Sequence, residues 1–378
     1  MAEHFCFWSI MQLVELSLPG CDFLTPGREE IYRALNLMSD WAEYHPSPLL
    51  FAPGLARLLD VGSVWIKDES KRFGLGGVKA LGAPYGLKQQ LRDHGFIPGS
   101  DDCARFTAVA ATDGNHGLAL AWAAAKFGCH ARIFVGEDVN TGRVQRMRDI
   151  GAEIVMIGGT YDDAVLAAEG AARDPDILLI TDTDYHGGLK VTRDIMAGYA
   201  VMGIECATQL AQARQSPSHV FLQCGVGGMA AGCALGLWHE SGQQPHVITV
   251  EAQNAACVKE SLARGTPVSV AGRLRTRMVG LSCGRPSLPA FDVLRRVARG
   301  SIAIDDAIAL HVQTELGRGV GGDAPLDCWD TGIAGIAGLW HVAQDPVLRA
   351  QFNLDQHSTV LVVNSEGAMP PLYAKSEY

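Results

Sequence analysis

Short strand patterns alternate with longer helical patterns along almost all of the 378 residues. The strand patterns, such as His219–Gln223 and Thr359–Val363, are mainly apolar along their whole length. Strands of this kind fit a parallel sheet that helices cover on both faces. The repeated strand–helix–strand units therefore predict a doubly wound α/β fold, in which ligands bind beyond the carboxyl ends of the strands.

The periodicity gives the bounds of the expected elements. The predicted strands are Val64–Lys67, Phe106–Ala111, Ala131–Gly136, Glu153–Ile157, Ile177–Ile180, His219–Gln223, Val247–Val250 and Thr359–Val363. The predicted helices are Val78–Asp93, His116–Phe127, Arg143–Ile150, Asp162–Ala172, Thr192–Ala213, Met229–His239, Asn254–Ala263, Ile304–Leu316 and Ile333–Ala343. No internal repeat or low-complexity linker interrupts this order.

The charge balance and the cysteines exclude several classes of protein. The formal net charge is −10 and 19% of the residues are charged, which argues against a nucleic-acid-binding protein. The ten cysteines form no Cys-x-x-Cys pair, and the 12 histidines form no His-x-x-x-His pair on a helix, so we expect no metal site. Residues 1–18 lack the basic start of a signal peptide, and no apolar run is long enough to span a membrane. We therefore expect a reduced, cytoplasmic protein.

Glycine is unusually frequent, with 43 residues. This is well above the usual ~7% of a chain. Because glycine has no Cβ, the excess serves turns, close backbone approach or loops that wrap a ligand. Three glycine-containing segments follow predicted strands, and each carries residues suited to chemistry.

The first segment leads to Lys79. Gly74, Gly76 and Gly77 follow a predicted strand, and Lys79 stands at the start of the next helix. The positive end of the helix dipole is expected to lower the pKa of Lys79. A neutral lysine amine can form a Schiff base with a carbonyl compound. A lone lysine is usually a solvated surface residue, but the glycine loop and its apolar flank favour the chemical interpretation.

The second segment, residues 112–117 (Thr-Asp-Gly-Asn-His-Gly), follows the predicted strand Phe106–Ala111. Small and polar residues at a strand-to-helix turn expose backbone N–H groups at a helix N-terminus, which suits a substrate carboxylate. Asn115 adds an amide donor. A simple helix cap by Thr112 or Asp113 is the alternative interpretation.

The third segment, residues 225–229 (Gly-Val-Gly-Gly-Met), follows the predicted strand His219–Gln223. Its backbone N–H groups can converge on a phosphate. With Ala230, the segment also fits a dinucleotide fingerprint, and Glu251 closes the next strand where a ribose-binding acid would stand. The loop alone therefore leaves a nucleotide and a simpler phosphate open.

One further motif is set aside. Residues 280–284 (Gly-Leu-Ser-Cys-Gly) match the pattern of a serine hydrolase, but that motif requires a preceding β-strand. The basic residues 273–277 occupy this position instead. We do not expect a serine nucleophile.

Together, the three segments resemble the fold-type II enzymes that use pyridoxal 5′-phosphate (PLP), a group that includes tryptophan synthase β and threonine dehydratase. Within it, the chain is most similar to the diaminopropionate ammonia-lyase family. The resemblance covers about residues 41–367. Its most specific pieces are Lys-Asp-Glu-Ser before Lys79, the run 112–117 with its Asp113, Asp182-Thr183, the loop 225–229, and Asn364-Ser365-Glu366-Gly367.

The resemblance implies two doubly wound, open twisted sheets flanked by helices. Residues 1–104 and 191–378 would form a large PLP-binding domain, and residues 105–190 a smaller mobile domain. It also implies a homodimer.

The resemblance also assigns roles to individual residues. Lys79 would hold PLP as a Schiff base, Asn115 would bind the ring 3′-oxygen, and Ser365 would contact the ring nitrogen. The phosphate would bind the backbone of Gly225, Val226, Gly227, Gly228 and Met229. The substrate would contact Thr112, Asp113, Gly114 and His116.

Asp113 and Asp182 would be the acid/base groups, together with Lys79. Removal of the Cα proton from either enantiomer requires a base on either face of the substrate, within hydrogen-bond reach of that proton. Two carboxylates would also attract a β-ammonium group. Val78 and residues 184–186 depart from the family pattern, and we expect both positions to line the substrate.

The implied reaction is the elimination of ammonia from D- or L-2,3-diaminopropionate, which gives pyruvate and two molecules of ammonia. Another PLP-dependent β-eliminase, such as a serine/threonine or hydroxyaspartate dehydratase, would share every cofactor motif. A nicotinamide-dependent dehydrogenase built on residues 225–230 and Glu251 is a more distant alternative. It leaves Lys79 and the run 112–117 unexplained.

Overall fold

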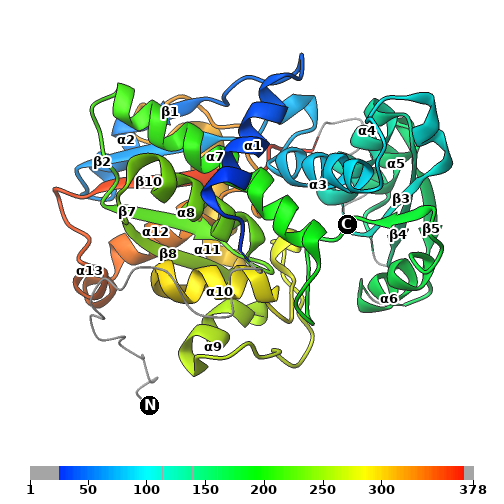
Figure 1. Cartoon of the computed structure of the whole chain (residues 1–378). Coiled ribbons are helices and arrows are strands. Elements are labelled where there is room, and N and C mark those ends of the chain that lie inside the picture. Colours follow the sequence, from blue (N-terminus) through cyan, green and yellow to red (C-terminus); the bar gives the residue numbers. More distant parts are fainter. Residues whose placement is uncertain (1–24, 113, 138, 160, 370–378) are drawn as a thin grey trace.

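The computed structural model describes residues 25–112, 114–137, 139–159 and 161–369, and it contains two sheets that lie side by side (Figure 1). The six-stranded sheet has the order β1 (Leu49–Phe51), β2 (Ser63–Asp68), β10 (Thr359–Asn364), β7 (His219–Gln223), β8 (His246–Ala252) and β9 (Ala298–Ile304). The four-stranded sheet has the order β5 (Glu153–Met156), β4 (His130–Val135), β3 (Thr107–Ala111) and β6 (Ile177–Leu179).

The strands pair in parallel, except at one edge. All pairs of the four-stranded sheet are parallel, as are the pairs of β2, β10, β7, β8 and β9. The short strand β1 pairs with β2 in the antiparallel direction. The predicted doubly wound α/β fold with two sheets is confirmed.

Alternate residues of the central strands face two separate cores. In β7, Val220 and Leu222 belong to one core, whereas Phe221 between them belongs to the other. In β10, Leu361 and Val362 divide in the same way. The continuous apolar character of these strands therefore reflects helices on both faces of the sheet, as the sequence predicts.

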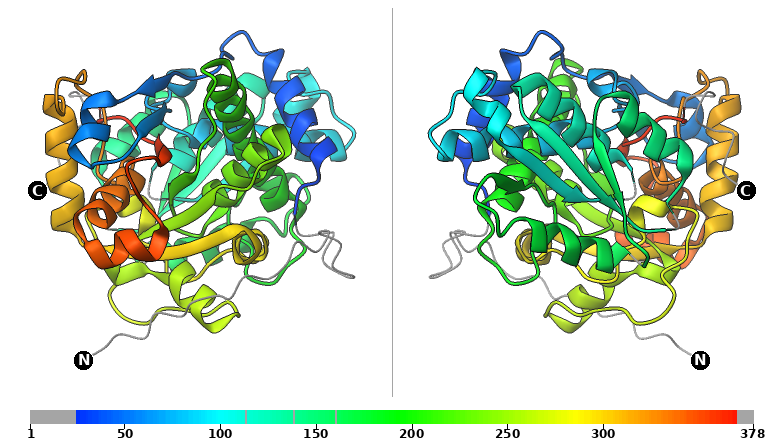
Figure 2. Two further views of the ribbon diagram at one scale, coloured as in Figure 1. Left: turned by 90° about the vertical axis from the view of Figure 1, so that its left-hand side faces the viewer. Right: turned by 90° about the vertical axis from the view of Figure 1, so that its right-hand side faces the viewer.

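Each face of the six-stranded sheet has its own set of helices (Figures 1 and 2). The first core includes α1 (Arg28–Ser39), α3 (Lys79–Asp93), α7 (Lys190–Gln212), α8 (Gly228–Ser241), α9 (Cys257–Arg264) and α10 (Leu288–Val297). The second core includes α2 (Pro53–Leu58), α11 (Asp306–Arg318), α12 (Ala334–Gln344) and α13 (Pro346–Phe352). The four-stranded sheet packs against α4 (Asn115–Phe127) and α5 (Thr141–Asp149) on one face and α6 (Tyr161–Ala171) on the other.

The sequence pattern missed several elements at the periphery. These are β1, β9, α1, α2, α10 and α13. The edge strand β9 pairs only with β8, and its sequence, Ala-Arg-Gly-Ser-Ile-Ala-Ile, mixes exposed and buried positions. Edge strands of this kind lack the continuous apolar signal that marks the central strands.

Glycines allow α7 and α8 to pack closely against each other. A Cβ atom on Gly236 would collide with the carbonyl oxygen of Ala200, and one on Gly203 would collide with that of Cys233. Part of the glycine excess therefore serves helix packing beneath the sheet, which the sequence analysis did not locate. Within the described residues, no helix has both the length and the apolar character to cross a membrane.

A buried network of charges links β2 to α7 and fixes the start of the loop that leads to Lys79. Lys67 Nζ lies 2.7 Å from Glu205 Oε2, and Arg72 lies 2.7 Å from the same oxygen. Arg72 Nε also lies 2.6 Å from Glu69 Oε2. All four side chains are buried, so each charge depends on its partners.

Removal of one member of this network should destabilise the fold strongly. We expect Glu205→Ala to lower the free energy of unfolding by about 3–5 kcal/mol, because Lys67 and Arg72 would be left as buried cations with too few partners. Urea denaturation followed by circular dichroism measures this loss. The control is Glu315→Ala, which removes an exposed partner of Arg318 and should cost at most about 1 kcal/mol. Equal losses in the two variants would contradict the expected role of the network.

Candidate active site

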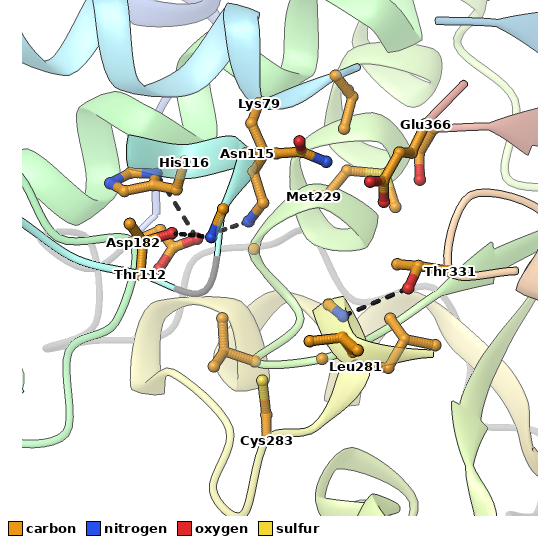
Figure 3. A pocket seen from close by; sticks show the side chains of 18 of the residues that line it. Lys79, Thr112, Asn115, His116, Asp182, Met229, Leu281, Cys283, Thr331 and Glu366 are labelled. Atoms are coloured by element: carbon orange, nitrogen blue, oxygen red, sulfur yellow. Dashed lines mark hydrogen bonds and ion pairs between the residues drawn. The ribbon is translucent and has the colours of Figure 1, made fainter. Parts of the chain in front are cut away.

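A cavity lies beyond the carboxyl ends of strands from both sheets (Figure 3). The run 112–117 follows β3, the loop 225–229 follows β7, and Ser365 follows β10. The cavity brings together the predicted site residues Lys79, Thr112, Gly114, Asn115, His116, Asp182, Gly225, Val226, Gly227, Gly228, Met229 and Ser365. Asp113 lies outside the described residues.

Lys79 is the first residue of α3, as the sequence predicts, and its loop is attached to the end of β10. The backbone N–H of Val78 donates to the carbonyl oxygen of Ser365 (2.9 Å), and that of Gly367 donates to Gly76 (3.1 Å). Phe73 has a φ of 51° and Gly76 a φ of 88°, so the loop needs residues that tolerate the left-handed region. These contacts fix the direction in which the Lys79 side chain leaves the helix.

Lys79 and Asp182 form an ion pair inside the cavity. Lys79 Nζ lies 2.6 Å from Asp182 Oδ2, and Figure 3 shows the two side chains pointing toward each other. The loop that carries Asp182 is held by its neighbours: Thr183 N–H donates to Thr181 Oγ1 (3.2 Å), and Thr192 Oγ1 of α7 donates to the Thr181 carbonyl oxygen (3.1 Å). Both charged groups thus sit on fixed backbone.

The charges of this pair shift both pKa values. Burial of the amine lowers the pKa of Lys79, but the neighbouring groups, with Asp182 first and then Tyr199 and Cys283, together outweigh burial, and the net shift is upward. Burial raises the pKa of Asp182, but Lys79, together with His116 and a backbone hydrogen bond, outweighs burial and lowers the value to about 2. The predicted lowering of the Lys79 pKa by the helix dipole is therefore wrong for this state of the protein, because a carboxylate lies at hydrogen-bond distance.

His116 flanks the pair from α4. Its Nε2 lies 2.7 Å from the carbonyl oxygen of Ile180, which can only accept, so Nε2 carries the hydrogen. Its Nδ1 lies 3.9 Å from Asp182 Oδ2. Burial lowers the pKa of His116, which keeps the ring neutral at pH 7. His116 is therefore a neutral imidazole, and the lone pair of its Nδ1 faces Asp182.

The loop 225–229 forms the opposite end of the cavity at the N-terminus of α8. The first N–H groups of a helix have no partner within it, so they are available to an anion. Gly227 has a φ of 95°, which an L side chain rarely adopts. A Cβ on Gly225 would lie 2.8 Å from the Gly280 carbonyl oxygen and 2.9 Å from Cys283 Sγ. Both positions therefore require glycine.

The sequence analysis missed several residues that line the cavity. They are Ala111, Arg143, Gln223, residues 279–283, Thr331 and Glu366. Figure 3 shows Glu366 and Thr331 across the cavity from Asp182. Arg143 Nη2 of α5 lies 3.4 Å from Glu366 Oε1, so this pair links the two sheets at the rim.

Some of the missed residues carried a signal in the sequence. The motif at 280–284 was set aside as a hydrolase signature, yet its first four residues form a cavity wall, and the short helix Val279–Leu281 precedes the serine. Glu366 stood next to Ser365 in a quoted motif. Val78 lines the cavity as expected, whereas residues 184–186 do not, because the Asp184 carboxylate accepts N–H groups of its own loop.

The environment of Glu251 argues against a dinucleotide site. Its side chain is fully buried at the end of β8. Its two carboxylate oxygens accept the backbone N–H groups of Val258 (2.7 Å) and Lys259 (2.6 Å) at the start of α9. A fully buried carboxylate whose two oxygens cap a helix lies out of reach of a ribose.

The family of pyridoxal-phosphate dependent enzymes matches residues 41–365. The chain belongs to this family. This match confirms PLP as the cofactor and excludes the alternative of a nicotinamide-dependent dehydrogenase. The prediction of a fold-type II enzyme is confirmed as well.

Two relatives and one crystal structure are similar to this protein over most of its length. The chain is 34% identical over 340 residues to a diaminopropionate ammonia-lyase of Escherichia coli K12, covering 86% of this chain and 85% of that protein. It is 28% identical over 347 residues to a probable D-serine dehydratase of Acidovorax, covering 79% and 75%. A crystal structure of the E. coli diaminopropionate ammonia-lyase with an aminoacrylate–PLP azomethine intermediate superimposes with a TM-score of 0.83 at 30% identity, covering 93% and 92% of the two chains.

The residues of the cavity fit PLP. The cofactor needs an amine for its aldehyde, an anion site for its phosphate and polar contacts for its ring. The cavity offers Lys79, the glycine loop at the N-terminus of α8, and the polar side chains of Asn115 and Ser365. A Cβ at Gly225 or Gly227 would disturb the close packing of that loop.

The ion pair should control how fast the protein takes up PLP. Lys79 must lose a proton before it can attack the aldehyde, and Asp182 raises the pKa of Lys79. In PLP-depleted protein, we expect Asp182→Asn to move the pH dependence of Schiff-base formation downward by about 1–3 units. Stopped-flow absorbance after mixing with PLP measures the rate at each pH. Asp176→Asn, which removes an exposed partner of Arg105, is the control. An unchanged profile in Asp182→Asn would show that the pair does not govern the amine.

Proposed function

We propose that this protein catalyses the PLP-dependent elimination of ammonia from 2,3-diaminopropionate. One molecule each of substrate and water gives pyruvate and two molecules of ammonia. The observation that carries the proposal is the similarity of 34% over 86% of the chain to a diaminopropionate ammonia-lyase, together with the Lys79–Asp182 pair in the cavity. The sequence analysis predicts the same reaction.

Lys79 binds the cofactor through its amine, and the backbone of residues 225–229 binds the phosphate at the N-terminus of α8. Asn115 donates to the ring 3′-oxygen, and Ser365 contacts the ring nitrogen. When bound, PLP withdraws electrons from Cα and so stabilises the carbanion that forms there. The side chains of Lys79, Asn115 and Ser365 would hold the cofactor in one orientation.

The substrate carboxylate binds at the N-terminus of α4. The backbone at Thr112, Asp113 and Gly114 precedes the first turn of that helix, whose dipole favours an anion. Thr112 Oγ1 accepts the N–H of Gly114 (3.0 Å), which fixes the turn. His116 contributes a neutral ring from the same turn, beside Asp182.

Asp182 and Lys79 move the protons. With its amine held by the cofactor, Lys79 would no longer face Asp182 as a free cation, and the pKa of Asp182 would rise. A carboxyl group tuned in this way can accept a proton from Cα and donate one to the leaving amine. The lone pair of His116 Nδ1, 3.9 Å from Asp182 Oδ2, faces the protonated form. Asp113 serves the opposite face of the substrate.

Residues 1–104 with 191–378 form a large domain, and residues 105–190 form a smaller domain that closes over the substrate. The strands of the four-stranded sheet fall between 107 and 179, and the Arg143–Glu366 pair spans the rim between the two parts. Closure excludes water from a reactive carbanion. We also propose a homodimer that works in the cytoplasm.

A panel of β-substituted amino acids tests the substrate. We expect kcat/KM to be highest for D- or L-diaminopropionate, with two ammonia molecules released per pyruvate. Serine would release one. Lys79→Ala should lose both the visible absorbance of the Schiff base and the activity. If serine, threonine or hydroxyaspartate is turned over far faster than diaminopropionate, the proposed substrate is wrong. The protein would then be a dehydratase, like the Acidovorax relative, a probable D-serine dehydratase.

The two carboxylates should divide the enantiomers between them. Asp113→Asn and Asp182→Asn each remove one base, and a positioned acid/base group contributes about 10²–10⁴-fold to rate. We therefore expect each variant to lose that factor in kcat/KM on one enantiomer of diaminopropionate and much less on the other. Steady-state kinetics on the separate enantiomers measure the difference. Equal losses on both enantiomers would remove the two-base scheme.

A further inference from the structure

Gln223 is the last residue of β7, and its buried side chain reaches the cavity wall beside Ser365. Its Nε2 lies 2.6 Å from the carbonyl oxygen of Gly332, 3.2 Å from that of Val363 and 2.8 Å from Ser365 Oγ. The amide thus links the ends of β7 and β10 to the turn before α12. No step of the proposed reaction uses it.

The two carbonyl groups fix the orientation of this amide. A carbonyl oxygen only accepts hydrogen bonds, so the NH₂ group of Gln223, and not its Oε1, must face Gly332 and Val363. Ser365 Oγ lies 2.8 Å from the same nitrogen and accepts a hydrogen bond from Gln223, so the three acceptors share the two hydrogens of the NH₂ group, with Val363 the most distant. The reverse orientation would place Gln223 Oε1 against the two carbonyl oxygens, which have no hydrogen to donate.

This orientation decides where the hydrogen of Ser365 points. The backbone of Ser365 is held at both ends, because its N–H donates to Gly332 (2.9 Å) and its carbonyl oxygen accepts from Val78 (2.9 Å). With one lone pair of Oγ engaged by Gln223, the hydroxyl hydrogen turns away from the amide. Ser365 is one of the residues that line the cavity.

We propose that Gln223 positions the Ser365 hydroxyl as a hydrogen-bond donor to the ring nitrogen of PLP and thereby keeps that nitrogen unprotonated. A nitrogen that accepts a hydrogen bond from a hydroxyl has no free lone pair for a proton. Gln223 acts only through Ser365, so it is a positioning residue. The inference rests on the assignment of Ser365 in the proposed function, and it does not depend on the substrate.

Loss of the amide would redirect the serine. In Gln223→Met, which keeps the length of the side chain, the carbonyl groups of Gly332 and Val363 each lose the amide donor, and that of Gly332 keeps only the backbone N–H of Ser365 among these contacts. The Ser365 hydroxyl can then rotate and donate to one of them, since buried carbonyl groups recruit any donor within reach. The ring nitrogen would lose its partner and become open to protonation.

The experiment uses PLP labelled with nitrogen-15 at the ring nitrogen, bound to the full-length protein. The chemical shift of that nucleus, followed against pH, reports its protonation without any substrate. We expect an unprotonated ring nitrogen in the wild type and protonation at clearly higher pH in Gln223→Met and in Ser365→Ala. The dissociation constant of PLP should rise about threefold to tenfold in Gln223→Met, the worth of one hydrogen bond.

The double variant separates positioning from general support of the fold. In the Ser365→Ala background, Gln223→Met should change PLP affinity by less than about twofold, because coupled residues give non-additive losses. Gln89→Met removes another buried amide, in α3, and should leave the nitrogen-15 profile unchanged.

Three outcomes would overturn the proposal. A wild-type ring nitrogen that is protonated at neutral pH contradicts it directly. Losses that multiply in the double variant would make Gln223 a structural residue alone. A Ser365→Ala variant with an unaltered profile would remove the assignment of Ser365 itself, whatever the substrate panel shows.

Discussion

The contact between Lys79 and Asp182 is the constraint around which the cavity is arranged. The two residues come from loops that follow strands of different sheets, β2 and β6, and their charged atoms lie 2.6 Å apart. Both side chains are partly buried, and charges that lose part of their water depend on good pairing geometry. The backbone on both sides must therefore be held firmly, and it is: Lys79 through the hydrogen bonds to the end of β10, Asp182 through the threonines that flank it.

The same pair explains how one carboxylate can serve two states. While Asp182 faces Lys79, the carboxylate stays ionised and the amine stays protonated, so the pair has no net charge. In the proposed scheme, an aldehyde held by the amine would remove that charge and leave the carboxylate to be balanced by a proton. His116 cannot compensate, because burial lowers its pKa and keeps it neutral. In this scheme, cofactor binding itself would turn Asp182 into a group that can take up a proton.

The sequence could predict the central strands and the segments next to them, because strongly apolar strands and glycine-rich turns are local patterns. Lys79, the run 112–117 and the loop 225–229 are of this kind, and all of their described members except Gly117 line one cavity. Arg143, Thr331 and Glu366 come together only through the fold, and no local pattern marks them. The predicted direction of the Lys79 pKa shift was wrong for the same reason. A helix dipole can be read along the chain, whereas the carboxylate of a residue about a hundred positions away cannot.

The glycine excess and the Gln223 amide show how far the cavity depends on structure beneath it. Some glycines shape the cofactor loops, but others, such as Gly203 and Gly236, let α7 and α8 approach closely enough to support the sheet from one face. α8 then presents its N-terminus where a phosphate is needed, and β7 ends with an amide whose orientation two backbone carbonyls dictate. In the proposed arrangement, the polarity offered to a bound ring is thus set by main-chain geometry, through the Gln223 side chain that lines the cavity beside Ser365. Substitution of Ser365 alone would therefore miss part of what tunes the cofactor.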